Sequence, residues 1–182
     1  MNSSSTMAAP APAPVELTAR IPDPANAFPP SNLIGVSITV DNCRFAVADA
    51  NGSDIWSFKT CVAAATCQGT SKLIDLVQCS ISLNVPGNTG ANVPEASQTN
   101  SLNYNIYAGI VGDCAWQQGG CPITQQNYID FVYGTLSEIN TDSWPDVNNV
   151  INNWWTSIKD WTATGETVPY LNFNDWLRFS DS

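Results

Sequence analysis

Hydrophobic and polar residues alternate in three stretches of the first two thirds of the chain. Every second residue is apolar over residues 34–40, and the same period recurs over 77–85 and 102–106. A period of two is typical of a strand that buries one face. A shorter apolar pair at Phe45 and Val47 predicts another strand, and the DANG sequence at 49–52 is a strong turn signal. These patterns predict an antiparallel sheet.

In the last third of the chain the hydrophobic period changes to that of a helix. Apolar residues spaced by three and four positions predict a helix that begins at Thr124 and runs to about residue 139. Ser143 and Asp146 have the spacing of a capping box and predict a second helix over about 145–162. The sequence NFNDWLRF, at 172–179, predicts a short third one. Strands followed by helices favour an α+β fold, in which the sheet packs against two or three C-terminal helices.

The first thirty residues differ in composition from the rest. They contain seven of the chain's twelve prolines and have almost no apolar periodicity. Because proline lacks a backbone donor and fixes φ, such a segment does not build a helix or a ladder. The predicted organisation is therefore a disordered Pro/Ala-rich leader or propeptide over 1–30 and a single globular domain over 31–182.

The cysteine count predicts a disulfide-stabilised protein. Six cysteines and no histidine exclude the mixed Cys/His zinc sites, and an even number favours three disulfides formed in an oxidising compartment. Fifteen connectivities are possible; short separations favour local pairs at 61–67 and 114–121, which would leave 43 to join 79. The predicted disulfide residues are Cys43, Cys61, Cys67, Cys79, Cys114 and Cys121.

Charge narrows the range of partners. The chain has 16 acidic and 6 basic residues, a formal net charge of −10. This charge opposes binding to phosphate backbones and to anionic membrane surfaces. No stretch approaches eighteen apolar residues, so we expect no membrane span. The sequon at Asn51 lies in a predicted turn and, with the disulfides, favours a secreted, extracellular glycoprotein.

The residue inventory gives little support for catalysis. Without histidine the common catalytic triads and His-ligated metal sites are excluded, and no GxSxG, P-loop or GxGxxG motif is present. Carboxylates remain as acid/base groups, but Asp130 and Glu138 lie about 80° apart around one predicted helix, which favours ordinary solvated side chains. We predict no catalytic residues, no metal and no cofactor. The alternative is a small secreted carbohydrate-active hydrolase or carbohydrate-binding module that uses carboxylates and exposed tryptophans.

The stretch NNVINNWWTSIKDW, at 148–161, holds three of the seven tryptophans. Counting 100° per residue from Val147 places Trp154 and Trp161 on the apolar stripe and Trp155 at its edge. Partial burial of Trp155 is one interpretation. The other is an exposed anchor of the kind enriched in protein interfaces, together with Trp144 or Trp176. The candidate partner-binding residues are Trp155, Trp144 and Trp176.

Two stretches carry a resemblance to a known family. IPDPANAFPPSNLIGVSITVDNC, at 21–43, and NNWWTSIKDW, at 152–161, in an acidic chain with six cysteines, resemble the small subunit of heterodimeric secreted laccases from wood-decaying fungi. The resemblance implies a non-catalytic protein that binds a larger copper oxidase subunit and stabilises or modulates it. The lack of histidine agrees with this role, because laccase-type coppers need histidine ligands.

Overall fold

The structure, a computed structural model, describes residues 33–50, 54–84, 93–141 and 144–181. The predicted leader, the Asn51 sequon and Ser143 of the predicted capping box lie outside these residues. Everything said below about the fold concerns the described ranges.

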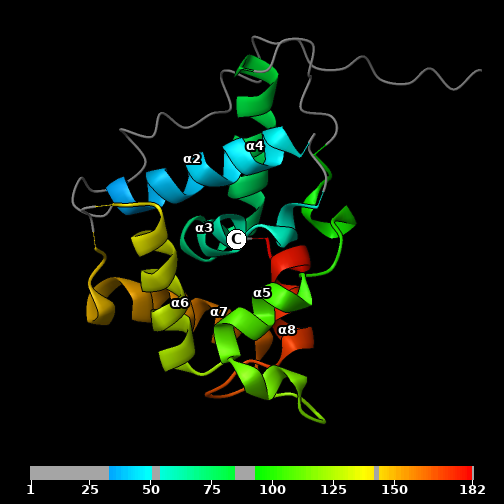
Figure 1. Cartoon of the computed structure of the whole chain (residues 1–182), viewed down its shortest axis with the longest axis vertical. Helices are drawn as coiled ribbons and strands as arrows, with labels where there is room; N and C mark the ends of the chain where they lie inside the picture. The colour runs from blue at the N-terminus through cyan, green and yellow to red at the C-terminus, as the bar shows by residue number, and fades with distance from the viewer. Residues whose placement is uncertain (1–32, 51–53, 85–92, 142–143, 182) are drawn as a thin grey trace, which may run out of the picture.

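The described residues form a helical domain, so the predicted α+β fold is wrong (Figure 1). No strand occurs within the described ranges, and the one β-type contact there is an isolated antiparallel bridge between Ile123 and Val168. The α-helices are α2 (Leu33–Asp49), α3 (Lys59–Gln68), α4 (Thr70–Asn84), α5 (Tyr104–Val111), α6 (Gln125–Glu138), α7 (Asn152–Thr162) and α8 (Tyr170–Phe179). The short elements are the 3-10 helices η1 (Ile55–Ser57), η2 (Ala96–Gln98) and η3 (Asp113–Trp116) and the π-helix η4 (Val147–Ile151).

The first predicted strand lies inside α2. Among the described side chains of this helix, Thr39, Cys43 and Val47 are buried; they are spaced four apart and therefore share one helical face. The alternation over 34–40 placed Thr39 on the solvated face of a strand, whereas the helix buries it. A helix whose inner face includes threonine and cysteine shows little of the usual contrast between apolar and polar sides, and the period of two was accidental.

The second and third predicted strands are helical for the same reason. In α4 the buried side chains of Leu73, Ile74 and Val77 follow helical spacing, and Val77 is the first residue of the alternating stretch. In α5 Tyr107 and Ile110 are buried three residues apart. Apolar residues at every second position also supply positions three and four apart, so a short run satisfies both patterns.

The middle of the domain is α3, which no sequence pattern predicted. All six residues of CVAAAT, from Cys61 to Thr66, are buried. Contacts join α3 to α2, α4, α6 and α7, and Figure 1 shows it between these helices. A helix that is apolar on all sides has no amphipathic period, which is why it was missed. Its small side chains leave room for the helices around it.

Two disulfides are present among the described residues. Cys43 in α2 pairs with Cys61 in α3, and Cys114 pairs with Cys121 as predicted. The predicted pairs at 61–67 and 43–79 are therefore wrong. Cys61 and Cys67 lie six residues apart on one helix, so they point in different directions and do not meet the geometry of a disulfide.

The C-terminal helices were predicted correctly as elements. α6 begins directly after Thr124, whose side chain accepts a hydrogen bond from the backbone N–H of Asn127 in a capping box. The second predicted helix is present as η4 followed by α7, and the Asp146 carboxylate caps it by accepting a hydrogen bond of 2.8 Å from the backbone N–H of Asn149. The third predicted helix, at 172–179, corresponds to α8.

Candidate functional site: two exposed tryptophans

Trp155 is a core residue. Its side chain is 1% exposed and stacks on Tyr128 of α6, with ring centroids 5.3 Å apart and planes at 22°. The interfacial anchor that we predicted at this position is therefore not on the surface of the folded protein. The alternative interpretation, burial of Trp155, agrees with the structure and goes beyond the partial burial expected.

The π-helix η4 explains why the helical count misplaced this tryptophan. A π-turn accommodates an extra residue, so every later residue is rotated backward relative to a uniform count of 100°. The buried stripe becomes Ile151, Trp155 and Ile158, with helical spacing of four and three. Trp161, predicted to be core, lies outside the stripe and is 45% exposed. Trp154 is partly buried against the core.

Trp176 is also a core residue. It is 3% exposed, and its ring stacks on Phe173 of the same helix at a centroid distance of 6.0 Å and an interplanar angle of 1°. Like Trp155, it is therefore not available as a surface anchor. Of the three tryptophans proposed for partner binding, Trp144 alone lies on the surface.

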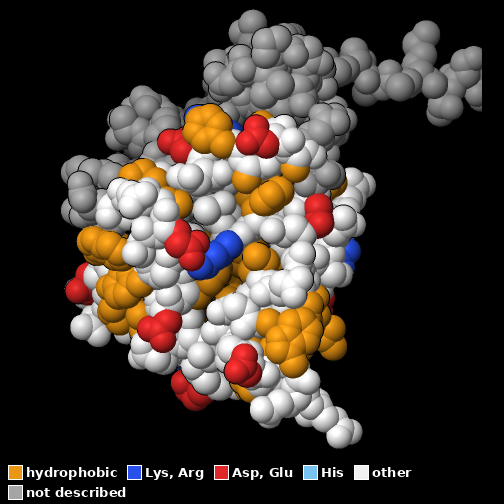
Figure 2. Space-filling view, in the orientation of Figure 1, with side chains coloured by type: hydrophobic (Ala, Val, Ile, Leu, Met, Phe, Trp, Pro, Cys, Tyr) orange, Lys and Arg blue, Asp and Glu red, His pale blue; other side chains and the backbone are white. Residues whose placement is uncertain are grey.

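Trp144 projects from the segment between α6 and η4 and is 51% exposed. Its ring meets Tyr133 of α6 edge-on, with centroids 5.7 Å apart at 74°. The Tyr133 hydroxyl donates a hydrogen bond of 2.9 Å to the carbonyl of Pro145, which is itself buried. We call Tyr133, Trp144 and Pro145 the Trp144 surface. Figure 2 shows hydrophobic side chains gathered on the same side of the molecule as α6.

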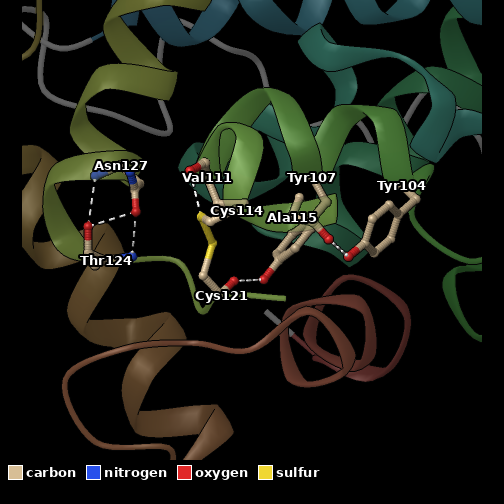
Figure 3. Close-up of a disulfide and its surroundings, with 8 residues drawn as sticks. All are labelled: Tyr104, Tyr107, Val111, Cys114, Ala115, Cys121, Thr124 and Asn127. Carbon is tan, nitrogen blue, oxygen red and sulfur yellow. Dashed lines mark hydrogen bonds between the residues drawn. A yellow bond between two sulfur atoms is a disulfide. The ribbon is translucent and has the colours of Figure 1, made fainter. Parts of the chain in front are cut away.

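A second exposed tryptophan lies in a loop that the sequence analysis did not single out. The Cys114–Cys121 disulfide closes residues 114–121. We call residues 113–121, which begin with η3, the Trp116 loop. Two tyrosines of α5 form hydrogen bonds to the backbone of this loop. The Tyr104 hydroxyl donates to the carbonyl of Ala115 over 2.6 Å, and the Tyr107 hydroxyl donates to the carbonyl of Cys121 (Figure 3). The loop is thus fixed at both ends to one helix.

Trp116 itself is 63% exposed. Its ring forms a T-shaped contact with Tyr104, with centroids 5.1 Å apart at 63°, and Tyr104 packs in turn against Tyr170 of α8 at 5.0 Å. The Tyr170 hydroxyl donates to the carbonyl of Leu102 over 2.6 Å. The sequence feature that could have indicated this site is a tryptophan followed by two glutamines and two glycines between two closely spaced cysteines.

The candidate carboxylates are engaged in separate contacts. Asp130 accepts a hydrogen bond of 2.8 Å from the Gln126 amide, whereas Glu138 forms an ion pair of 2.7 Å with Lys59 of α3. The described part of the chain brings no three Cys, Asp or Glu side chains into a group that could hold a metal ion. These carboxylates show no shared site for acid/base chemistry.

Cys67 retains a thiol in a poorly hydrated position. Burial raises the pKa of this thiol from 9.0 to about 12, and a hydrogen bond with the Thr66 hydroxyl partly offsets the rise. Part of the residue reaches the surface, but its thiol is desolvated. Burial likewise raises the pKa of the Cys79 thiol. Because the thiolate is the reactive form, both thiols are protected near neutral pH.

Cys67 should therefore be slow to alkylate in the folded protein. At pH 8.5 we expect iodoacetamide to label it at least about a hundredfold more slowly than in urea, measured by mass spectrometry of the Cys67 peptide. The raised pKa also determines how the folding stability depends on pH. The buried, neutral Cys67 thiol makes its full contribution to stability below pH 9, and this contribution declines as the pH rises toward 12. Equal labelling rates in the native and denatured states would contradict the burial.

Comparison with protein-family models, curated proteins and solved structures gives no match to this chain. In the described part of the chain, no helix is both long and apolar enough to cross a membrane. The two disulfides indicate that the protein folds in an oxidising environment.

Proposed function

We propose that this protein is a secreted, non-catalytic accessory subunit that binds a larger extracellular oxidase of the laccase type and stabilises or modulates it. The observation that carries the proposal is the Trp144 surface, where a tryptophan is half exposed yet held in place by a neighbouring ring. The disulfides support an oxidising setting, as expected of a secreted protein. The resemblance to laccase small subunits supplies the class of partner.

The Trp144 surface has the physical properties of an interface anchor. Tryptophan is enriched among residues that dominate binding energy, because one rigid ring buries a large apolar area. The edge contact with Tyr133 limits the orientations of Trp144 before binding, so less conformational entropy is lost on association. The exposed amides of Asn148 and Asn149 nearby are suited to a polar rim.

Replacing Trp144 with alanine should weaken the complex without unfolding the protein. We expect a loss of about 2 kcal/mol of binding free energy, roughly a thirtyfold rise in Kd. The partner is first identified by size-exclusion chromatography and mass spectrometry of native culture fluid, and its affinity for each variant is then measured by biolayer interferometry.

Trp161→Ala is the matched control, because Trp161 is similarly exposed but lies on α7. It should bind like the wild type. The proposal fails if the chain elutes from native fluid at its own mass, with no oxidase in fixed proportion. If a complex forms but Trp144→Ala leaves Kd unchanged, the accessory role stands and the assigned surface is wrong.

The second candidate function is carbohydrate binding, and the exposed Trp116 ring favours it. Its hydrolase form requires two carboxyl groups about 5 to 10 Å apart across the scissile bond. The separate contacts of Asp130 and Glu138 give that form no support. The binding form needs only an accessible aromatic plane and hydrogen-bonding neighbours.

A further inference from the structure

We infer that the Trp116 loop is a binding site for a neutral glycan chain, separate from the Trp144 surface. The inference rests on the second candidate function and adds the site and the class of ligand. It does not depend on whether the protein binds an oxidase. Three features of the loop carry it: the rigidity of its support, the exposure of its tryptophan and the kind of polar groups next to that residue.

The loop is fixed in place before any ligand binds. The Cys114–Cys121 disulfide closes it, and hydrogen bonds from Tyr104 and Tyr107 tie its backbone to α5 (Figure 3). The rings of Tyr104, Tyr107 and Tyr170 contact one another at centroid distances from 5.0 to 5.4 Å. A site that is ordered in advance binds without the entropic cost of ordering a loop.

The exposed ring of Trp116 is not explained by folding. Its contact with Tyr104 is T-shaped, and 63% of the residue remains in water. Figure 2 shows hydrophobic side chains gathered over the region where α5 and α8 meet. The face of an aromatic ring carries partial negative charge and attracts the partially positive C–H groups that line one face of a pyranose ring. A sugar ring therefore matches an indole of this exposure.

The surroundings of Trp116 favour an uncharged ligand with many hydroxyl groups. The Trp116 loop and α5 contain no lysine or arginine, so these two segments offer no basic partner for a phosphate, sulfate or carboxylate group. The exposed side chains next to Trp116 are Gln117 and Gln118, and Asn105 is exposed on α5. Side-chain amides both donate and accept hydrogen bonds, as sugar hydroxyls do. Asp113 is the single acid of the loop.

The test compares two tryptophan variants of the full chain against defined glycans. Wild type, Trp116→Ala and Trp144→Ala are incubated with insoluble cellulose, xylan and chitin, and the bound fraction is measured over a range of protein concentrations. Binding of the soluble hexasaccharides of the same three polymers is followed by tryptophan fluorescence and isothermal calorimetry. We expect wild type and Trp144→Ala to bind at least one of the three glycans equally, and Trp116→Ala to bind it at least about tenfold more weakly.

Two further measurements separate a lost site from a lost fold. Thermal unfolding and near-UV circular dichroism of Trp116→Ala should match those of wild type, because the ring is mostly exposed. If that variant fails to fold, Gln117→Leu and Gln118→Leu replace it and should reduce binding of the same glycan. Trp116→Phe should bind with an affinity between wild type and Trp116→Ala, since it keeps a smaller aromatic plane.

The inference is overturned if wild type binds none of the three glycans, or if Trp116→Ala binds as well as wild type. It is also overturned if Trp116→Ala disrupts the complex with an oxidase while glycan binding is unchanged, which would make the loop part of a protein interface. Loss of the oxidase complex in Trp144→Ala, with glycan binding intact, bears on the accessory function alone.

Discussion

Replacing Trp155 with alanine should destabilise the fold by about 3 to 5 kcal/mol, the range measured for large aromatic residues removed from a core. The side chain is fully enclosed, and its stacking on Tyr128 joins α7 to α6. Alanine would leave a cavity at this junction and remove the ring contact as well. The expected result is a large fall in the urea midpoint and in Tm, measured by circular dichroism with an unchanged denaturant slope.

The matched control is Trp161→Ala on the same helix. Trp161 is 45% exposed, so we expect a loss below about 1 kcal/mol, even though the same number of atoms is removed. Similar effects of the two substitutions would show that the π-turn does not set the face of α7 as described. A weakened partner complex with full stability in Trp155→Ala would restore this residue as an interface anchor.

The two halves of the chain differed in how well the sequence predicted their fold. α6 and the helix formed by η4 and α7 begin at side-chain caps, Thr124 and Asp146, and both helices were predicted from their pattern. Asp146 was predicted as the acid of a capping box that starts at Ser143, whereas in the structure it is itself the N-cap. α2, α4 and α5 were assigned as strands because their apolar residues fit a period of two as well as a helical face. α3 has no polar side to contrast with its buried residues, and its place follows from tertiary packing.

The surface residues were predicted only in part. Trp144 follows the end of α6, where a large residue has no helical stripe to join, and it is exposed. The position of Trp155 depends on a π-turn that has no simple sequence signal. Trp116 could have been found from its place between two close cysteines, because a short disulfide-closed loop has too little interior to bury an indole. The short separation of these cysteines predicted a local disulfide and carried no prediction for Trp116.

Removing the Cys43–Cys61 disulfide, by replacing both cysteines with alanine, should cost about 3 kcal/mol of stability. The bond joins α2 to the central helix α3, and its sequence separation is 18 residues. Closing a loop of that size lowers the entropy of the unfolded chain by an amount worth about 3 kcal/mol. Both cysteines are buried, so the substitution also loosens the packing of the two helices. Chemical unfolding followed by circular dichroism measures the change.

The Cys114–Cys121 pair provides the comparison. Its separation is 7 residues, so the same entropic argument gives a smaller loss, about 2 kcal/mol, when both are replaced with alanine. If the Trp116 loop binds glycans, this variant should lose that binding while remaining folded, because the loop would no longer hold Trp116 in one position. Removal of the Cys43–Cys61 disulfide should instead lower the folding stability more and glycan binding less. Equal losses of stability for the two pairs would mean that the short bond contributes as much to the core as the long one. Unchanged glycan binding in the Cys114/Cys121 variant would mean that Tyr104 and Tyr107 suffice to order the loop.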